Sequence, residues 1–362
     1  MGRTKKVSSM AQQIKNKKPR SDKHIDKIKL VSSPCTLFNC ACSDSHRGAF
    51  SVGRMVNIIG DSSAGKTMFA LCVLAEAARD KNFDDYRLVI DDVENALTFN
   101  LDYLFGTKMA SRLEPPNVVD DIPEPSDTIE DFHCNIARLL DDEKPFIYVL
   151  DSFDALDSDQ DQDKVEEMRS AKERGKKAKG TYGMSKAKKA SDLLRNICKR
   201  LKDTNSILII ISQTRDNIDP MSFEKRTRSG GRALKFYAHH EIWLSCGKKI
   251  KSKDTVIGAD VIAKITKNKL TGKVRQIKFP IYYDYGVDNT RASIDFLVEK
   301  GVFKKTKLTF EWPDKALKGT MPKLIGLIEA KQKHVRILKK LVGKTWNEFE
   351  ESLKTGRRRR YE

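Results

Sequence analysis

Several features that would place this chain in common protein classes are missing from it. It has no run of 18 apolar residues, so we expect no transmembrane helix. Residues 1–29 lack the apolar core of a signal peptide, and we therefore do not expect secretion. The seven cysteines match no usual zinc-binding spacing, although Cys35, Cys40 and Cys42 lie near His46. We expect them to be reduced structural thiols, with a metal site as the alternative.

The chain carries a large excess of positive charge. Its 362 residues include 69 Lys and Arg against 50 Asp and Glu, which gives a formal net charge of +19. Such a balance favours a polyanionic partner, with nucleic acid ahead of an anionic membrane surface. Ten of the basic residues fall within residues 1–29, which we expect to form a basic arm. This arm either docks on a neighbouring molecule or stays solvated.

The pattern of apolar residues predicts an α/β fold. Apolar runs typical of buried parallel strands alternate with segments of helical spacing, which indicates a mostly parallel, doubly wound sheet. We expect strands at residues 54–59, 87–91, 146–151 and 207–212, and helices at residues 68–78, 128–140 and 185–202. Three later segments alternate in polarity and should be antiparallel strands that extend the sheet: residues 239–245, 260–266 and 275–283. Residues 291–362 should form a small, helical and basic C-terminal region.

Residues 60–67 read Gly-Asp-Ser-Ser-Ala-Gly-Lys-Thr, the pattern of a phosphate-binding loop. The loop lies between a predicted strand and a predicted helix, where backbone N–H groups can point at a polyphosphate. Lys66 can reach the terminal phosphates, and the Thr67 hydroxyl can hold Mg²⁺. A Cβ atom at Gly60 or Gly65 would obstruct the tight turn and the anion. We expect the whole loop to bind ATP, with a simple Gly/Ser turn as the alternative: Gly60, Asp61, Ser62, Ser63, Ala64, Gly65, Lys66 and Thr67.

Polar residues end three of the predicted strands. Asp151 closes an apolar strand, which is the usual place for the acid that holds a Mg²⁺-bound water. Glu94 lies just past the strand at residues 87–91 and can orient the attacking water, although Asp92 is a rival and a helix-terminal role is the alternative. Gln213 follows the fourth strand directly, where its amide can contact the γ-phosphate and pass a signal onward.

Two charged segments, at about residues 157–183 and 214–231, follow the third and fourth strands. In the second segment, Gly230 and Gly231 would let backbone approach a phosphodiester closely. We expect both segments to contact DNA because the whole chain is basic, with solvated loops as the alternative. The residues expected at the DNA are Lys188, Ser191 and Arg195 on one helix face, and Arg226, Arg228, Gly230, Gly231 and Arg232.

Taken together, these motifs resemble RecA, the family of bacterial homologous-recombination ATPases. The resemblance spans residues 50 to about 300, in the order and at the spacing typical of the family. The low overall similarity and the basic tails look more like a phage-encoded RecA-like recombinase. Its motifs are residues 54–67 with the phosphate-binding loop, residues 90–97 with Glu-x-Ala-Leu, Val-Leu-Asp-Ser-Phe-Asp-Ala-Leu at residues 149–156, Ile-Ser-Gln-Thr-Arg at residues 211–215, Gly-Gly-Arg-Ala-Leu-Lys-Phe-Tyr-Ala at residues 230–238, and Lys-Ile-Thr-Lys-Asn-Lys at residues 264–269.

The resemblance implies a role for each matching position. Glu94 would be the general base, and Gln213 the γ-phosphate sensor. Lys267 and Lys269 would reach into the ATP of a neighbouring subunit and act with Lys66 in catalysis. Phe236 would lie at that subunit junction beside the nucleotide, and Tyr283 would stack on adenine. The cofactors implied are ATP and Mg²⁺, with Thr67 and Asp151 at the metal.

The resemblance also implies a RecA-type P-loop ATPase core at residues 50–290, between a protomer-docking segment at residues 1–49 and a C-terminal region at residues 291–362. It implies a DNA-dependent ATPase that forms helical filaments on single-stranded DNA, pairs them with double-stranded DNA, and works in the cytoplasm of a bacterial cell or a phage-infected host. The alternatives are a hexameric RecA-type helicase and a non-catalytic mediator protein. The first DNA loop is longer than the family's, Arg232 replaces its Asn, and one extra residue precedes Glu94.

Overall fold

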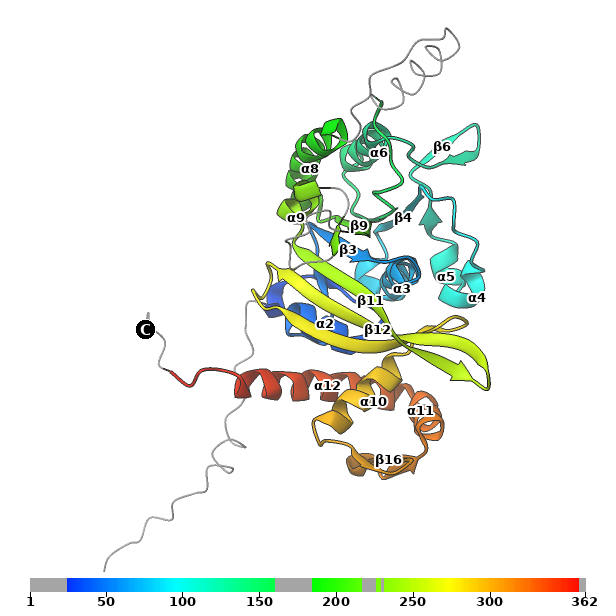
Figure 1. The fold of residues 1–362 in the computed structure, drawn as a ribbon, viewed down its shortest axis with the longest axis vertical. Coiled ribbons are helices and arrows are strands. Elements are labelled where there is room, and N and C mark those ends of the chain that lie inside the picture. Colours follow the sequence, from blue (N-terminus) through cyan, green and yellow to red (C-terminus); the bar gives the residue numbers. More distant parts are fainter. Residues whose placement is uncertain (1–24, 160–183, 217–225, 229–230, 358–362) are drawn as a thin grey trace, which may run out of the picture.

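The structure, a computed structural model, describes residues 25–159, 184–216, 226–228 and 231–357. Figure 1 shows a central sheet with helices on both faces and a smaller C-terminal module below it. The expected α/β class with a mostly parallel sheet and flanking helices is confirmed. None of the helices in these residues is long and apolar enough to cross a membrane.

Within the described residues, ten strands form the main sheet, in the order β14-β13-β12-β11-β3-β9-β8-β4-β5 with β10 paired to β9. The strand β3 leads into the loop at residues 60–67, and its two neighbours, β9 and β11, are parallel to it. The strands β12, β13 and β14 are antiparallel to their neighbours. Their bounds are β3 Arg54–Gly60, β4 Arg87–Asp92, β5 Leu113–Glu114, β8 Phe146–Asp151, β9 Ile207–Asp216, β10 Arg226–Arg228, β11 His240–Ser252, β12 Thr255–Asn268, β13 Arg275–Tyr282 and β14 Gly286–Val287.

The sheet separates two hydrophobic cores, because successive side chains of a strand point to opposite faces. In β9, Ile207, Ile209 and Ile211 join one core, while Leu208 and Ile210 join the other. The first core includes α3 (Lys66–Arg79), and the second includes α6 (Ile129–Asp141), α8 (Met184–Thr204) and α9 (Gly231–Tyr237). Both faces of the central strands are therefore covered, as their continuous apolar sequences predict.

The second half of the expected protomer-docking segment, residues 1–49, packs into the core. Residues 25–51 form η1 (Ile25–Lys27), β1 (Leu30–Val31), α2 (Thr36–Ser43) and β2 (Phe50–Ser51), and every residue of α2 is buried. Burial raises the pKa of Cys35 to about 12, so this thiol stays protonated at neutral pH. Among the described residues, no group of three or more His, Cys, Asp or Glu side chains could hold a metal ion. Residues 1–24 lie outside the described part of the chain.

Some short elements were not expected from the sequence. They lie between β4 and α6: α4 (Leu101–Phe105), α5 (Thr107–Ala110), β6 (Asn117–Val119) and β7 (Ile122–Glu124). A single helical turn, η2 (Lys81–Phe83), follows α3. Such short segments carry too few residues for a hydrophobic period to be recognised.

The C-terminal region combines helices with a small sheet, whereas we expected helices alone. Its elements are α10 (Asn289–Glu299), β15 (Lys304–Thr306), β16 (Thr309–Trp312), η3 (Pro313–Lys315), β17 (Leu317–Gly319), α11 (Met321–Glu329) and α12 (Gln332–Ser352). Trp312 is buried and stacks on Phe303, with ring centroids 5.2 Å apart. The strands have only three or four residues, so their alternation is hard to detect in the sequence.

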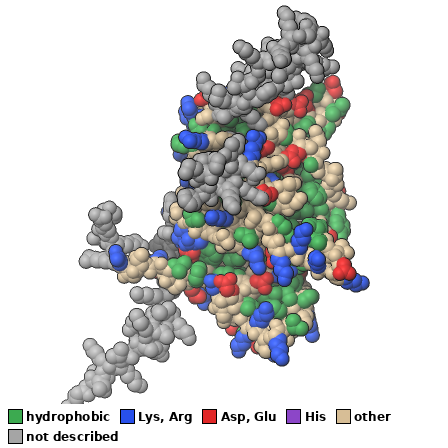
Figure 2. All heavy atoms as spheres, viewed as in Figure 1, with side chains coloured by type: hydrophobic (Ala, Val, Ile, Leu, Met, Phe, Trp, Pro, Cys, Tyr) green, Lys and Arg blue, Asp and Glu red, His purple; other side chains and the backbone are tan. Residues whose placement is uncertain are grey.

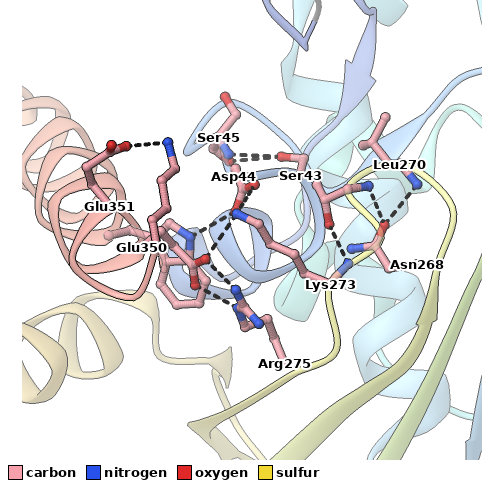
Figure 3. Close-up of polar contacts among 12 residues, drawn as sticks. Ser43, Asp44, Ser45, Asn268, Leu270, Lys273, Arg275, Glu350 and Glu351 are labelled. Atoms are coloured by element: carbon pink, nitrogen blue, oxygen red, sulfur yellow. Dashed lines mark hydrogen bonds and ion pairs between the residues drawn. The ribbon is translucent and has the colours of Figure 1, made fainter. Parts of the chain in front are cut away.

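A network of ion pairs fastens α12 to the main sheet (Figure 3). Glu350 accepts a hydrogen bond from Arg275 Nε at 2.6 Å, and its Oε2 lies 3.0 Å from Lys273 Nζ. Lys273 also binds Asp44 at the end of α2, at 2.6 Å, and the Trp346 indole donates to the same carboxylate at 3.3 Å. Burial alone would raise the pKa of Glu350, but the hydrogen bonds from Arg275 and Lys273 outweigh it, so this pKa is lowered.

Candidate nucleotide and nucleic-acid site

The phosphate-loop motif connects β3 to α3 at the carboxyl edge of the sheet. Gly60 ends β3, and a Cβ atom there would come within 2.5 Å of the Leu244 carbonyl oxygen, so this glycine is required by the neighbouring strand. Gly65 has φ +82°, a conformation that residues with a side chain rarely adopt, and it caps a helix of 14 residues. The backbone N–H groups of that helix end form an anion-binding site of the kind that phosphates occupy.

Lys66, Thr67 and Asp151 lie together beside this loop. The Lys66 ammonium donates to the Asp61 carbonyl at 2.8 Å, and burial lowers the pKa of this lysine. The Thr67 hydroxyl donates to Asp151 Oδ2 at 2.5 Å. Asp151 ends the buried strand β8, and burial, the largest cause, raises its pKa to about 6. The site thus combines one buried cation with one carboxylate that is costly to ionise.

These groups fit a nucleoside triphosphate with Mg²⁺. A threonine hydroxyl and a carboxylate are the oxygen donors that Mg²⁺ prefers, and they already lie within hydrogen-bond distance of each other. Lys66 and the N-terminus of α3 provide positive charge for phosphate oxygens. The structure therefore places every group that the eight-residue motif needs at one edge of the sheet.

Glu94 and Gln213 meet next to these residues. Gln213 Nε2 donates to Glu94 Oε1 at 3.0 Å, and the Ser152 hydroxyl donates to the same oxygen at 2.5 Å. The rival acid is engaged differently: Asp92 Oδ1 and Oδ2 accept the backbone N–H groups of Ala96 and Leu97 at 3.1 and 2.8 Å. Asp92 therefore holds the turn after β4, while the exposed Glu94 carboxylate faces polar side chains at the strand ends.

Lys267 and Lys269 lie beside the last turn of α9. Both amino groups donate to the Phe236 carbonyl oxygen, at 3.0 and 3.2 Å. Cations at this position complement the partial negative charge of the helix C-terminus. Phe236 itself is 70% exposed and Tyr283, after β13, is 59% exposed. An exposed aromatic ring of this size is available to a neighbouring molecule.

The described residues expected at DNA lie around the contact between α8 and α9. Arg195 is exposed and its Nε lies 3.4 Å from the Tyr237 hydroxyl on α9, while Ser191 is half-buried on the same helix. Gly231, with φ +70°, and the exposed Arg232 begin α9. Gly230 and most of both expected loops, residues 160–183, 217–225 and 229–230, lie outside the described residues, as do the side chains of Lys188, Arg226 and Arg228.

Sequence reasoning missed residues that connect this edge of the sheet. The Thr214 hydroxyl donates to the side chain of Asp61 in the phosphate loop. Asp154 accepts the backbone N–H of Gln213 at 2.5 Å, and its other oxygen lies 3.9 Å from Arg215. The sequence did indicate these residues, because each of them closely follows a buried apolar run or lies in the loop at residues 60–67. Only the parallel register brings them together.

The family comparison agrees with this geometry. The family model of the RecA N-terminal domain matches residues 18–288 of the chain, about three quarters of it. The chain belongs to the RecA family. Protein RecA of Brucella anthropi is 29% identical to it over 272 residues, which cover 75% of this chain and 68% of that protein. The mitochondrial DNA repair protein recA homolog of Dictyostelium discoideum is 28% identical over 298 residues, which cover 80% of this chain and 59% of that protein.

Membership confirms the resemblance to RecA-like recombination ATPases that the motifs indicated. RecA family proteins in general bind ATP with Mg²⁺, bind DNA and form oligomers, and the chain shares the fold that supports this chemistry. The phage origin and the cellular compartment stay predictions. The roles of individual residues and the three-part division of the chain also stay predictions.

Proposed function

We propose that this protein is an ATP-dependent DNA recombinase that forms filaments on single-stranded DNA and promotes homologous pairing and strand exchange. The observation that carries this proposal is the hydrogen bond between Gln213 and Glu94 at 3.0 Å. It joins the carboxylate assigned as the general base to Gln213, which lies directly before the second DNA segment at residues 214–231. A change at the nucleotide can therefore be passed directly to the DNA-binding part of the chain.

The nucleotide-binding role is assigned to the loop at residues 60–67. Lys66 and the N-terminus of α3 hold the phosphates, and Thr67 with Asp151 holds Mg²⁺. When bound, the metal would neutralise part of the negative charge on the phosphates during phosphoryl transfer. The hydrogen bond between Thr67 and Asp151 supports this assignment, because it brings both oxygen donors to one point.

Glu94 is assigned as the general base that orients and deprotonates the attacking water. Ser152 and Gln213 both donate to Glu94 Oε1, which fixes the direction of the carboxylate. Gln213 is well placed to exchange that bond for one to a phosphate oxygen. The exchange would move Gln213 together with Thr214 and Arg215, and so would signal nucleotide occupancy to the loop that follows.

Lys267 and Lys269 are assigned to the ATP of a neighbouring subunit, with Phe236 and Tyr283 at the junction. Their shared carbonyl partner positions the two lysines beside the exposed Phe236 ring. This arrangement supports an ATP site completed by a second subunit, which makes hydrolysis depend on assembly. The DNA is assigned to residues near α8 and α9 and in the two loops: Lys188, Ser191, Arg195, Arg226, Arg228, Gly230, Gly231 and Arg232.

These assignments divide the chain into three parts with different roles. Residues 50–290 would be the ATPase core, residues 1–49 would include the protomer-docking segment, and residues 291–362 would be the C-terminal region. The structure places α2 in the core, so the docking role falls to the residues before it.

Electron microscopy with single-stranded DNA and a slowly hydrolysed ATP analogue tests the proposal. Continuous helical filaments, together with strand exchange between a circular single strand and a linear duplex, are the expected result. Closed hexameric rings that unwind duplex DNA would identify a helicase instead. A Lys66→Ala variant serves as the control, because it should lose nucleotide binding and therefore filament formation.

A further inference from the structure

The side chains of β12 change from one face of the sheet to the other near the end of the strand. Ala263 and Ile265 pack into the first core, the one that includes α3. Side chains two positions apart on a strand lie on the same face, so Lys267 and Lys269 would follow Ile265 into this core if the strand were regular. Their amino groups instead reach the Phe236 carbonyl oxygen at the end of α9, the helix that packs into the second core.

A β-bulge between β11 and β12 accounts for this change of face. Glu241 on β11 lies opposite Lys267 on β12. The next residue of β11, Ile242, lies opposite Ile265, which leaves Thr266 as an extra residue on β12. An extra residue of this kind puts the side chains that follow it on the opposite face of the sheet. The bulge therefore directs the two lysines toward α9.

The Glu241 carboxylate ties the extra residue to the neighbouring strand. Glu241 is only 3% exposed, and its Oε1 accepts a hydrogen bond from the Thr266 hydroxyl at 2.9 Å. The Trp243 indole N–H donates to the same oxygen at 3.2 Å. A buried carboxylate is costly unless hydrogen bonds compensate for the lost water, so these contacts favour one conformation of the bulge. Glu241 thus fixes the place at which β12 changes face.

Charge alone does not distinguish Lys267 and Lys269 from other basic residues. On the face that Figure 2 shows, Lys and Arg side chains are interspersed with Asp and Glu. What sets these two lysines apart is that both amino groups donate to one carbonyl oxygen. A lysine side chain is flexible, and holding it in a single geometry costs conformational entropy. The bulge and the end of α9 arrange both amino groups before any ligand arrives.

We propose that Glu241 and Thr266 are positioning residues that hold Lys267 and Lys269 on the face of the sheet where they meet the ATP of a neighbouring subunit. The inference rests on the proposed function for the role of the two lysines at that ATP. Glu241 and Thr266 act only through the direction of the strand end. Without the bulge, the lysines would no longer face the phosphates, and they would stabilise less of the charge in the transition state.

The test begins with two variants at one position. Thr266→Val removes the hydroxyl with little change in volume, whereas Thr266→Ser keeps the hydroxyl. In Thr266→Val, the kcat for DNA-dependent ATP turnover should fall about 10- to 100-fold, as expected for a catalytic group misplaced by about 1 Å, while KM stays within about 2-fold. Thr266→Ser should keep the wild-type rate. Glu241→Ala removes the acceptor and should resemble Thr266→Val, whereas Glu241→Gln keeps an acceptor oxygen and should resemble the wild type. Circular dichroism and thermal unfolding check that each variant folds.

A double-mutant cycle and a chemical probe separate positioning from a general effect on stability. When Lys267 and Lys269 are both changed to Ala, adding Thr266→Val should lower single-turnover phosphate release no further, because the groups that it positions are gone. The probe is acylation by an N-hydroxysuccinimide ester, quantified by mass spectrometry in the absence of ATP and DNA. Both lysines should react several-fold faster in Thr266→Val than in the wild type or Thr266→Ser, because an amino group held against a carbonyl is less available to the reagent. The exposed Lys251 should react equally in all three.

Normal turnover in Thr266→Val overturns the proposal. An equal decrease with and without the two lysines, or unchanged acylation of Lys267 and Lys269, also overturns it. Absence of DNA-dependent ATP turnover in the wild type would refute the proposed function. Faster acylation in Thr266→Val would, even then, show that the bulge sets the direction of the lysines.

Discussion

At the scale of the residue, two carboxylates of similar appearance in the sequence have different partners in the structure. Asp92 and Glu94 are two positions apart, and residue type alone leaves both as candidates for the base. The Asp92 carboxylate accepts two backbone N–H groups of its own turn, whereas the Glu94 carboxylate accepts side-chain hydrogen bonds from Ser152 and Gln213. This difference in partners supports Glu94 as the group that acts on water.

The first prediction follows from this contrast. Glu94→Gln should lower DNA-dependent ATP turnover by roughly 10²- to 10⁴-fold while leaving nucleotide binding intact, because an amide cannot accept the proton from water. Asp92→Asn should change turnover only a few-fold, since the amide oxygen can still accept one of the two backbone N–H groups. Turnover and nucleotide binding are measured separately, by phosphate release and by fluorescent-nucleotide titration. A large decrease in Asp92→Asn with normal turnover in Glu94→Gln would reverse the assignment.

The second prediction concerns the free-energy cost of keeping the buried Asp151 carboxylate ionised. Burial raises its pKa from 3.8 to about 6, so the folded state favours the protonated acid. The penalty for ionising it therefore grows as pH rises through that interval. Without nucleotide and Mg²⁺, Asp151→Asn should stabilise the fold by no more than about 3 kcal/mol near pH 7.5 and about half of that near pH 5.

Urea unfolding at the two pH values measures this gain in stability, and ATP turnover measures its functional cost, which should be a decrease of roughly 10- to 100-fold. A variant that is less stable than the wild type at both pH values would show that the Thr67 hydrogen bond matters more than desolvation.

At the scale of the element, β9 is the strand that joins the two functions. Its central residues are buried on both faces. Near its end, the residues from Thr214 to Asp216 pair with β10, while Gln213 contacts Asp154 and Thr214 contacts the phosphate loop. The sequence suggested that the second DNA segment begins at Thr214. The structure shows instead that the strand continues to Asp216, so the segment is anchored by a short antiparallel pair.

The third prediction tests this link. Thr214→Val removes the hydroxyl that donates to Asp61 with little change in volume, so this side-chain contact between the phosphate loop and β9 is lost while the strand pairing of Gly60 with Gln213 stays. Turnover without DNA should stay near the wild-type rate, while its stimulation by single-stranded DNA should fall several-fold. The control is Thr320→Val, because the Thr320 side chain makes no capping hydrogen bond at the start of α11. An unchanged stimulation ratio in Thr214→Val would exclude this route of coupling.

At the scale of the whole molecule, the C-terminal module is held by charges as well as by apolar packing. Glu350 lies at the centre of the network with Lys273, Arg275 and, through Lys273, Asp44. It connects the last helix with α2 and with the loop between β12 and β13, which are far apart in the chain. The network therefore couples the stability of the module to that of the core.

The fourth prediction follows from the lowered pKa of Glu350. A carboxylate with a depressed folded-state pKa contributes stability above its unfolded value, and this contribution is lost as pH falls through the folded value. Glu350→Gln should cost about 1.5 to 3 kcal/mol of unfolding free energy at neutral pH, and the difference should shrink in acid.

Glu348→Gln on the same helix is the matched control. Its carboxylate pairs with Lys344 at 3.8 Å in an exposed position, so its removal should change stability by less than about 1 kcal/mol. Thermal unfolding of both variants, monitored at several pH values, compares them. Equal destabilisation by the two variants would show that burial of Glu350 adds nothing to its ion pairs.

Local periodicity and spacing were enough to predict the α/β class, the order of the main strands and helices, and the phosphate loop. Each of these is encoded by consecutive residues: apolar runs such as residues 146–151 bury a strand on both faces, and Gly65 in residues 60–67 allows a turn that residues with a side chain rarely adopt. The tertiary structure alone decided which polar residues meet. Asp61 and Thr214 are 153 positions apart, and Asp44 and Lys273 are 229 apart. Their contacts depend on the parallel register of β3, β9 and β8 and on the packing of α12, and no local pattern records either of these long-range arrangements.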